Sequence, residues 1–436
     1  MRYFSIDVRA VSPLALRADH AAKGSRTAEY ISGTVLMGGL AAVHRLLYPH
    51  DTPDFEDLFL KDRILYPNLY PAMFGDEGMQ ESNLPVYPFP RTARTCKRFS
   101  GFLYKFKDED KDEDEERHGV RDALLDWAMF KLSESSEEID SQAVARLIGE
   151  LKAHKSCHQP RGTRICLEAM DEMEGYYRRE DDEPYHMIAA ESTHSSMRLQ
   201  TYTGINRELG TVEEGILYNR EVFEEGSRFW GVAKLPDDEK LVDKFKKLIC
   251  EANKEGLLRV GTGRTRGLGK VKIVTNTQSN GNEMFDAFKA RLLKFQQALE
   301  KRAQAKGVQL SHPFYFTLTL HSPLILADES LRYRGRIDGE TLAKEAGLPE
   351  GSLRLLYEAA GGQRIAGWNE LWGMPRTAEY AIDSGSVFLF ASTLQVEDAW
   401  LERLFALEEA GMGRRRAEGF GRVCFSDPFH LQEELQ

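Results

Sequence analysis

Two segments of this 436-residue chain combine glycines with basic side chains in a way that suits phosphate binding. The first is GTGRTRGLGKVKI at residues 261–273, and the second is GMGRRRAEGFGRVCF at residues 411–425. Both contain G-x-G-R near the start and G-x-G-[KR]-V near the end. Glycines let a backbone approach a ligand closely and adopt positive φ, while basic side chains supply charge. Each segment therefore predicts a loop that can hold an anion.

The two loops do not match the established mononucleotide or dinucleotide motifs. A dinucleotide fingerprint needs a third glycine where the chain has Arg266 and Arg416, and a phosphate-binding P-loop fails at Arg264 and Val271. Arginines within the loops favour a polyanion such as RNA, because a guanidinium bridges phosphate oxygens and stacks on bases. The alternative is that the glycines only turn tight corners while the arginines face water. Because the pattern occurs twice, we predict RNA contact by at least one loop.

The elements that must position these loops also occur twice in the same order. An alternating strand at residues 4–10 runs into SPLALR, and another at residues 314–320 runs into SPLILA. Further along each half come a Gly-Ser turn with an apolar strand, a helix, the glycine loop and a final strand. The turn and strand are EEGSRFWGV at 224–232 and DSGSVFLFA at 383–391, and the helices are residues 237–254 and 396–410. This order indicates an internal duplication.

The repeated order predicts an α+β protein with two tandem ferredoxin-like (RRM-like) βαββαβ domains. The first domain covers residues 1–310, with its first helix within residues 29–48 and a large insertion at about 50–195. The second covers residues 311–436, and a helix at about 283–305 joins the halves. Aromatic side chains such as Tyr315 either stack on bases from an open sheet face or lie against a covered face.

In such a sheet the last strand pairs beside the first, so each glycine loop should lie beside the segment that follows the first strand. In the first domain that segment carries Arg17, His20, Lys23 and Arg26. It leads to Ser32-Gly33 at the start of a helix, whose free N–H groups favour an anion.

Composition limits the compartment and the partners. The run KDEDKDEDEER at residues 107–117 holds eight acids and three bases, and it contributes −5 to the net charge of −11. Such a run stays solvated, so we expect it to face away from RNA and to leave room for a local basic surface. The N-terminus lacks the features of a signal peptide, and no apolar run reaches transmembrane length. With five scattered cysteines, these features predict a cytoplasmic protein with reduced thiols and no membrane partner.

A group of histidines and cysteines in the insertion could bind zinc, because thiolate and imidazole are ligands that this ion prefers. Its members are His154, Cys157, His158 and Cys166. Their spacing matches no established zinc pattern, and reduced thiols in an inserted segment are the alternative. The sequence therefore predicts no metal site and no cofactor, and it leaves zinc at these four residues open.

These features resemble the RAMP superfamily of CRISPR-associated proteins, which are built from ferredoxin-like domains with a glycine-rich loop before the last strand. The resemblance rests on SPLALR with YISGTVLMGGLAA (30–42), on TGINRELGTVEEGILYNREVF (203–223) and on the two glycine loops. Two tandem domains, each with its own loop, look like the subunit that caps a type III antiviral effector complex, most similar to its III-D version. The resemblance is poor across residues 50–195.

The resemblance implies a non-catalytic subunit that binds the 5′ handle of the guide RNA (crRNA). Its implied protein partners are the large polymerase-like subunit and a RAMP backbone subunit. It implies handle contacts by these residues of the two loops: Gly261, Gly263, Arg264, Arg266, Gly267, Gly269, Lys270, Gly411, Gly413, Arg414, Arg415, Arg416, Gly419, Gly421 and Arg422. Arg17, Lys23 and Arg26 join this set. Arg207 either touches RNA or pairs with Glu208 or another carboxylate.

The sequence allows four alternatives to this role to be weighed. A metal-independent endoribonuclease that processes crRNA would use His20 as general acid or base, although no second such group stands out nearby. Backbone subunits cleave target RNA with a loop aspartate, and Asp19 lies in the comparable loop. Polymerase-like chemistry needs clustered aspartates, which the string Gly75-Asp76-Glu77 does not supply. A protein-only scaffold would use the loops to bind acidic partners. We predict that the protein is not an enzyme.

Overall fold

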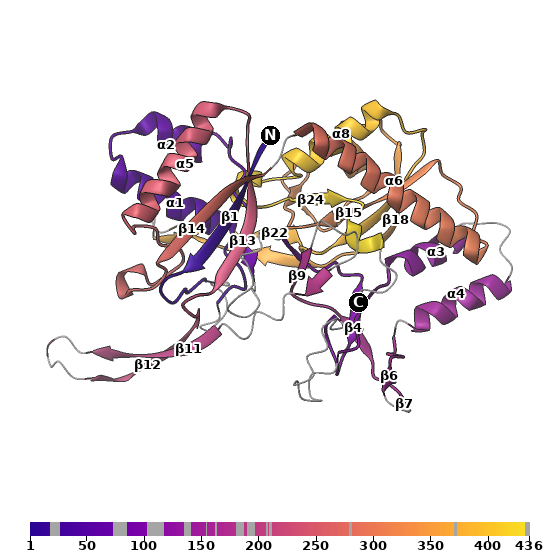
Figure 1. The fold of residues 1–436 in the computed structure, drawn as a ribbon, viewed down its shortest axis with the longest axis horizontal. Coiled ribbons are helices and arrows are strands. Elements are labelled where there is room, and N and C mark those ends of the chain that lie inside the picture. The colour runs from indigo at the N-terminus through magenta and orange to yellow at the C-terminus, as the bar shows by residue number, and fades with distance from the viewer. Residues whose placement is uncertain are drawn as a thin grey trace.

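The structure is a computed structural model, and its description covers most of the chain. The described residues are 1–17, 27–72, 85–102, 117–134, 141–153, 155–161, 164–179, 187–189, 197–205, 208, 212–278, 281–369 and 373–431. Every helix within these ranges is too short or too polar to cross a membrane. The predicted α+β composition is confirmed (Figure 1).

The first half of the chain folds around a four-stranded antiparallel sheet in the order β14-β1-β13-β2. Three helices pack on one face and form the first core. The α5 helix begins where Asp238 accepts hydrogen bonds from two backbone N–H groups of the first turn. The bounds of these elements are β1 Arg2–Ala10, β2 Tyr70–Pro71, β13 Arg228–Leu235, β14 Val271–Gln278, α1 Gly33–Leu47, α2 Thr52–Phe59 and α5 Glu239–Lys254.

The second half folds around another four-stranded antiparallel sheet, in the order β18-β23-β15-β24. In both sheets the first strand of the half lies between its third and last strands, and the second strand lies outside the third. The long helix α6 joins the halves and buries its apolar stripe in two cores. The bounds are β15 Phe314–Leu320, β18 Leu353–Ala359, β23 Val387–Ser392, β24 Val423–Phe425, α6 Gly281–Lys306, α7 Gly339–Ala346 and α8 Asp398–Ala410.

Within the insertion, the described residues from 86 to 189 form small sheets and the helices α3 and α4, and the segment 197–223 that follows forms a long hairpin. The hairpin β11–β12 extends away from the first sheet, whereas α3 packs on the second sheet (Figure 1). The bounds are β3 Val86–Pro88, β4 Ala93–Cys96, β5 Val120–Asp122, β6 Pro160–Arg161, β7 Arg164–Ile165, β8 Met170–Glu172, β9 Tyr176–Arg179, β10 Met187–Ala189, β11 Met197–Ile205, β12 Val212–Phe223, α3 Leu124–Glu134 and α4 Ser141–Ala153.

Short elements complete the description. They are β16 Leu326–Ala327, β17 Tyr333–Arg334, β19 Gly362–Ile365, β20 Trp368–Asn369, β21 Met374–Pro375, β22 Glu379–Ile382 and the 3-10 turns η3 Arg264–Arg266, η4 Arg416–Glu418 and η5 Pro428–Leu431.

Both sheets are covered more fully than the alternation of their first strands predicts. In β1, the polar residues Ser5 and Asp7 are buried, and Asp7 forms an ion pair with Arg228 of β13. All seven residues of β15 are buried, because α3 covers the face that the alternation left open. Of the two alternatives for Tyr315, the covered face is therefore the one observed.

Candidate nucleic-acid interface

Each glycine loop lies beside the Ser-Pro-Leu segment of its own half, as the sequence predicted. In the first loop, the backbone N–H of Gly269 donates to the carbonyl O of Pro13 (2.9 Å). In the second, the N–H of Gly421 donates to the carbonyl O of Pro323 (2.9 Å). Gly269 and Gly421 thus hold equivalent positions, and the two halves build the same corner.

The hydrogen bonds also correct the alignment of the loop starts. Thr262 donates its N–H to the carbonyl O of Ala15 (2.8 Å), and Arg414 donates to that of Ile325 (3.0 Å). The residue before each of these donors is a glycine, so Gly261 is equivalent to Gly413. The shared G-x-G-R pattern had matched Gly261 with Gly411, two residues away. Of the two shared patterns, only G-x-G-[KR]-V therefore aligns in three dimensions, and G-x-G-R does not.

One position separates the two loops chemically. Gly263 precedes the first 3-10 turn with a φ of +73°, and Arg415 precedes the second with a φ of +58°. This left-handed conformation is natural for glycine and uncommon for arginine. The second loop therefore places a guanidinium where the first has bare backbone.

The first loop lies beside the hairpin β11–β12. Arg266 is exposed, donates a hydrogen bond to the Tyr218 hydroxyl and lies over that ring, with its Cζ 6.0 Å from the ring centroid. Tyr218 in turn stacks on Tyr202 across the hairpin, with ring centroids 5.4 Å apart and planes 14° from parallel. The result is an arginine and two parallel aromatic rings beside a glycine backbone, an arrangement that suits stacking on bases.

Basic side chains from other elements add to the charge of the first loop. Arg220, two residues after Tyr218, has its Nη1 2.7 Å from the position that a Cβ would take on Gly263. Lys270 follows the loop, and Arg17 ends the neighbouring segment with a bridge to Thr27. These basic side chains come from separate parts of the chain and lie in or next to the first loop and its neighbouring segment.

The second loop is instead packed against the first half of the chain. Arg415 forms ion pairs with Glu379 (2.6 Å) and Glu418 (2.7 Å), and Glu418 accepts a hydrogen bond from the hydroxyl of Thr34 in α1 (2.9 Å). Arg422 donates to the carbonyl O of Leu65 (2.8 Å). The second loop thus joins the two halves, and two carboxylates of the same chain hold the Arg415 guanidinium.

The buried charges at this junction have shifted pKa values. Burial alone would raise the pKa of the Glu418 carboxyl, but the hydrogen bonds and charge of Arg415 outweigh it and lower the pKa to about 2. Burial lowers the pKa of Arg422 to about 10, so its guanidinium stays charged at neutral pH. Glu418 is therefore ionised in the folded protein and acts as the internal anion of the junction.

The anion site predicted at Ser32-Gly33 is filled from within the chain. The N–H of Gly33 donates to Oδ1 of Asn68 (2.9 Å), and the carbonyl O of Glu418 lies 2.5 Å from the position of a Cβ on Gly33. The prediction that this helix start faces an external anion is wrong, because the second loop covers it.

The remaining predicted residues divide into two groups. Lys23, Arg26, Arg207, His20, Asp19, His154 and the string Gly75-Asp76-Glu77 lie outside the described residues. Arg414 and Arg416 are exposed on the outer side of the second loop. RNA contact by any of the predicted residues stays a prediction.

Sequence reasoning missed Tyr202, Tyr218 and Arg220 as members of this surface. Tyr218 and Arg220 are two residues apart on one strand and therefore share a face. That spacing was available in the sequence, but the pairing of Tyr218 with Tyr202 depends on the register of the hairpin.

Comparison with known proteins identifies the family. The profile described as "RAMPs: RAMP superfamily" matches residues 7–272. This match spans more than half of the chain, so the chain belongs to the RAMP superfamily. No curated protein sequence matches it.

Several solved structures give weak structural alignments. A type III-B Cmr-beta complex bound to cognate target RNA and AMPPnP aligns with 11% identity over 93% of both chains (TM-score 0.31). Cmr-beta bound to cognate target RNA aligns with 12% identity over 63% of this chain and 96% of that chain (TM-score 0.28). Oligomeric Cmr4 from Pyrococcus furiosus aligns with 12% identity over 64% and 99% (TM-score 0.28). These alignments are too weak to assign a role.

Proposed function

We propose that this chain is a non-catalytic, RNA-binding subunit of a type III CRISPR effector complex. In this role it holds the 5′ handle of the crRNA and caps the complex, in contact with the large polymerase-like subunit and a RAMP backbone subunit. Membership of the RAMP superfamily supports the class of protein. One observation carries the RNA-binding role: the first glycine loop brings Arg266 and Arg220 together with the stacked rings of Tyr202 and Tyr218.

The proposal includes two tandem ferredoxin-like domains, residues 1–310 and 311–436. Its support is the strand order, in which each half places its first strand between its third and its last. The matching Gly-Pro hydrogen bonds of the two loops support a common origin of the two halves.

We further assign the two loops different tasks. The first loop binds the sugar-phosphate backbone of RNA, because its arginines lie among other cations and beside aromatic rings. The second loop holds the two domains together through Arg415, Glu418 and Arg422. The duplicated corner thus serves RNA in one domain and domain packing in the other.

The test is to purify the protein with its natural assembly, extract the bound RNA and sequence it. Short RNAs that share one 5′ repeat-derived end are the expected result. Arg220→Glu should reduce the bound RNA at least about tenfold, since a reversed charge repels the phosphate backbone. The control is Arg332→Glu, which changes an arginine whose side chain is 79% exposed in the second domain. Recovery of no RNA, or equal loss from both variants, would contradict the proposal.

A nuclease assay separates this role from the enzymatic alternative. Repeat RNA should remain intact when it is incubated with the purified protein in the presence of a chelator. Cleavage that survives the chelator and disappears in His20→Ala would make the protein an endoribonuclease. Binding to an acidic protein partner, without any retained RNA, would make it a protein-only scaffold.

A further inference from the structure

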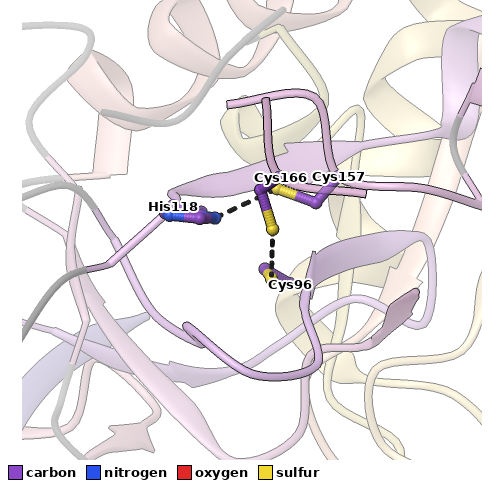
Figure 2. Close-up of side chains that lie close together, drawn as sticks. All are labelled: Cys96, His118, Cys157 and Cys166. Atoms are coloured by element: carbon purple, nitrogen blue, oxygen red, sulfur yellow. Dashed lines mark hydrogen bonds between the residues drawn. The ribbon is translucent and has the colours of Figure 1, made fainter. Parts of the chain in front are cut away.

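Four side chains that are far apart in the sequence meet inside the insertion. They are Cys96, His118, Cys157 and Cys166, and all four are buried. One potential ligand atom from each lies within 4.8 Å of the others. Figure 2 shows these side chains pointing toward one another from separate segments of the chain.

The backbone fixes each of these segments. Cys96 ends β4, the central strand of the β5-β4-β8 sheet, and His118 lies just before β5. The N–H of Cys157 donates to the carbonyl O of Glu168 (2.8 Å), and the N–H of Cys166 donates to that of Gln159 (2.9 Å). Strand pairing therefore positions Cys96, and backbone hydrogen bonds position the other three residues.

The His118 ring is held in place from two sides. Its backbone N–H donates to the carbonyl O of Phe99 (3.0 Å), and its ring lies against the Phe99 ring with centroids 4.5 Å apart. This arrangement directs Nδ1 toward Cys157 Sγ at 3.1 Å. A fixed imidazole next to a thiol suits a ligand pair of one metal ion.

The distances fit one tetrahedral ion. Zinc–sulfur bonds of about 2.3 Å and a zinc–nitrogen bond of about 2.0 Å place two sulfurs roughly 3.8 Å apart and a sulfur and a nitrogen roughly 3.5 Å apart. Cys96 Sγ and Cys166 Sγ are 4.0 Å apart, and His118 Nδ1 and Cys157 Sγ are 3.1 Å apart. Adjustments of a few tenths of an ångström bring both distances to tetrahedral values.

The packing around the three cysteines gives a physical reason for a metal ion. Among the described residues, Phe99 and Met170 are the partly buried apolar side chains that pack against the three cysteines, and Ala93 and Val120 of the same sheet belong to a neighbouring core. Metal ligation commonly adds stability where cysteines form the centre of a small buried cluster.

We propose that Cys96, His118, Cys157 and Cys166 bind one structural zinc ion through three Sγ atoms and the His118 Nδ1 atom. Three thiols and one imidazole fill all four tetrahedral positions, so no position remains for a substrate or a reactive water. Binding releases the three thiol protons to solvent, and the histidine binds as the neutral ring. The ion thus stabilises this cluster and takes no part in chemistry.

This set differs from the one considered in the sequence. Cys157 and Cys166 belong to both sets, but His158 is exposed and its Nδ1 lies 2.8 Å from the carbonyl O of Ser156. Cys96 and His118 take the remaining positions. Their distance from the other two cysteines in the sequence explains why spacing alone did not identify them.

The zinc also has a role in the larger structure. Arg91, just before β4, forms ion pairs with Glu172 of the same small sheet (3.2 Å) and with Asp383 of the second half (3.3 Å). Its backbone N–H donates to the carbonyl O of Gly385 (2.8 Å). Through Arg91, the small sheet that contains Cys96 is therefore attached to the second half of the chain.

The first experiment measures the metal content of the full-length chain, purified without added metal, by mass spectrometry. One zinc per chain is the expected result, falling at least about fivefold in Cys96→Ser and in Cys166→Ser. Cys250→Ser is the matched control and should keep its zinc, because Cys250 is exposed on α5 and lies outside the cluster. A wild-type chain with no zinc, with iron instead, or with a Cys96–Cys166 disulfide would overturn the proposal.

A second experiment uses the wild-type chain, so that misfolding of a variant does not decide the result. X-ray absorption at the zinc edge should give three sulfurs at about 2.3 Å and one nitrogen at about 2.0 Å. Oxygen ligands or a set of two sulfurs would overturn the assignment. Neither experiment depends on RNA binding.

Discussion

The contact between α1 and the second glycine loop makes Gly33 sensitive to a single methyl group. A Cβ on Gly33 would lie 2.5 Å from the carbonyl O of Glu418, 2.7 Å from its carbonyl carbon and 2.9 Å from Cα of Gly419. All three are backbone atoms, so no side chain can rotate away to relieve the clash. Overpacking of this kind costs about 1–3 kcal/mol.

Gly38 is the matched control for Gly33→Ala. It lies in the same helix, is exposed, and has no atom within 4 Å of its Cβ position. Gly38→Ala should therefore stabilise α1 by about 0.5–1 kcal/mol, since alanine favours the helix. Both changes add the same methyl group, and only Gly33→Ala disturbs the junction between the halves.

The assay is thermal unfolding combined with amide hydrogen exchange. With an unfolding entropy of about 2.1 cal/mol/K per residue, each kcal/mol shifts the Tm of a unit this large by about 1–1.5 °C, so Gly33→Ala should melt at least about 1.5 °C below Gly38→Ala. Exchange at the Tyr66 N–H, which donates to the carbonyl O of Ala417 (3.2 Å), should rise in Gly33→Ala alone. If Gly33→Ala melts at or above Gly38→Ala, the second loop does not hold the halves together as described.

Two further predictions concern the same loops. The pKa of Glu418 is lowered from 4.5 to about 2. The ionised carboxyl therefore stabilises the fold fully above pH 4.5, and this stabilisation is lost as the pH falls toward 2. The stabilisation amounts to about 3 kcal/mol at most. The stability gap between wild type and Glu418→Gln in urea titrations should therefore shrink from pH 6 to pH 3, and a constant gap would refute it. In the first loop, Gly269 has a φ of +81° and its Cβ would lie 2.2 Å from the carbonyl O of Val260, whereas Gly267 has a similar φ and open space around it. Gly267→Ala should lower the free energy of unfolding by about 1–2 kcal/mol, and Gly269→Ala should lower it clearly more, as measured by urea unfolding. Equal losses would show that the backbone moves to make room for the methyl group at residue 269.

The parts of the fold that the sequence predicted depend on local patterns. Apolar spacing predicted a helix at residues 237–254, and the structure has α5 over Glu239–Lys254. The Gly-Ser turns and Ser-Pro-Leu segments likewise predicted which segments meet, because antiparallel pairing places the last strand beside the first.

The parts that the sequence did not predict depend on contacts across long separations. Arg415 was predicted as a phosphate ligand, and its ion pair with Glu379 is visible only once the second loop and β22 are placed side by side. Cys96 and His118 meet the other two cysteines only through strand pairing in the insertion. Composition and short motifs carry no information on such pairings.

Whether the first glycine loop binds RNA is decided by the Kd of the full-length chain for a crRNA with its 5′ handle, measured over a range of salt concentrations. Arg264→Gln with Arg266→Gln should weaken binding at least about tenfold and make the salt dependence shallower by about 2, since two phosphate contacts are removed. Arg414→Gln with Arg416→Gln changes two exposed arginines of the second loop and should leave Kd within about twofold. Unchanged binding by the first pair, or an equal loss from both pairs, would contradict the division of tasks between the two loops.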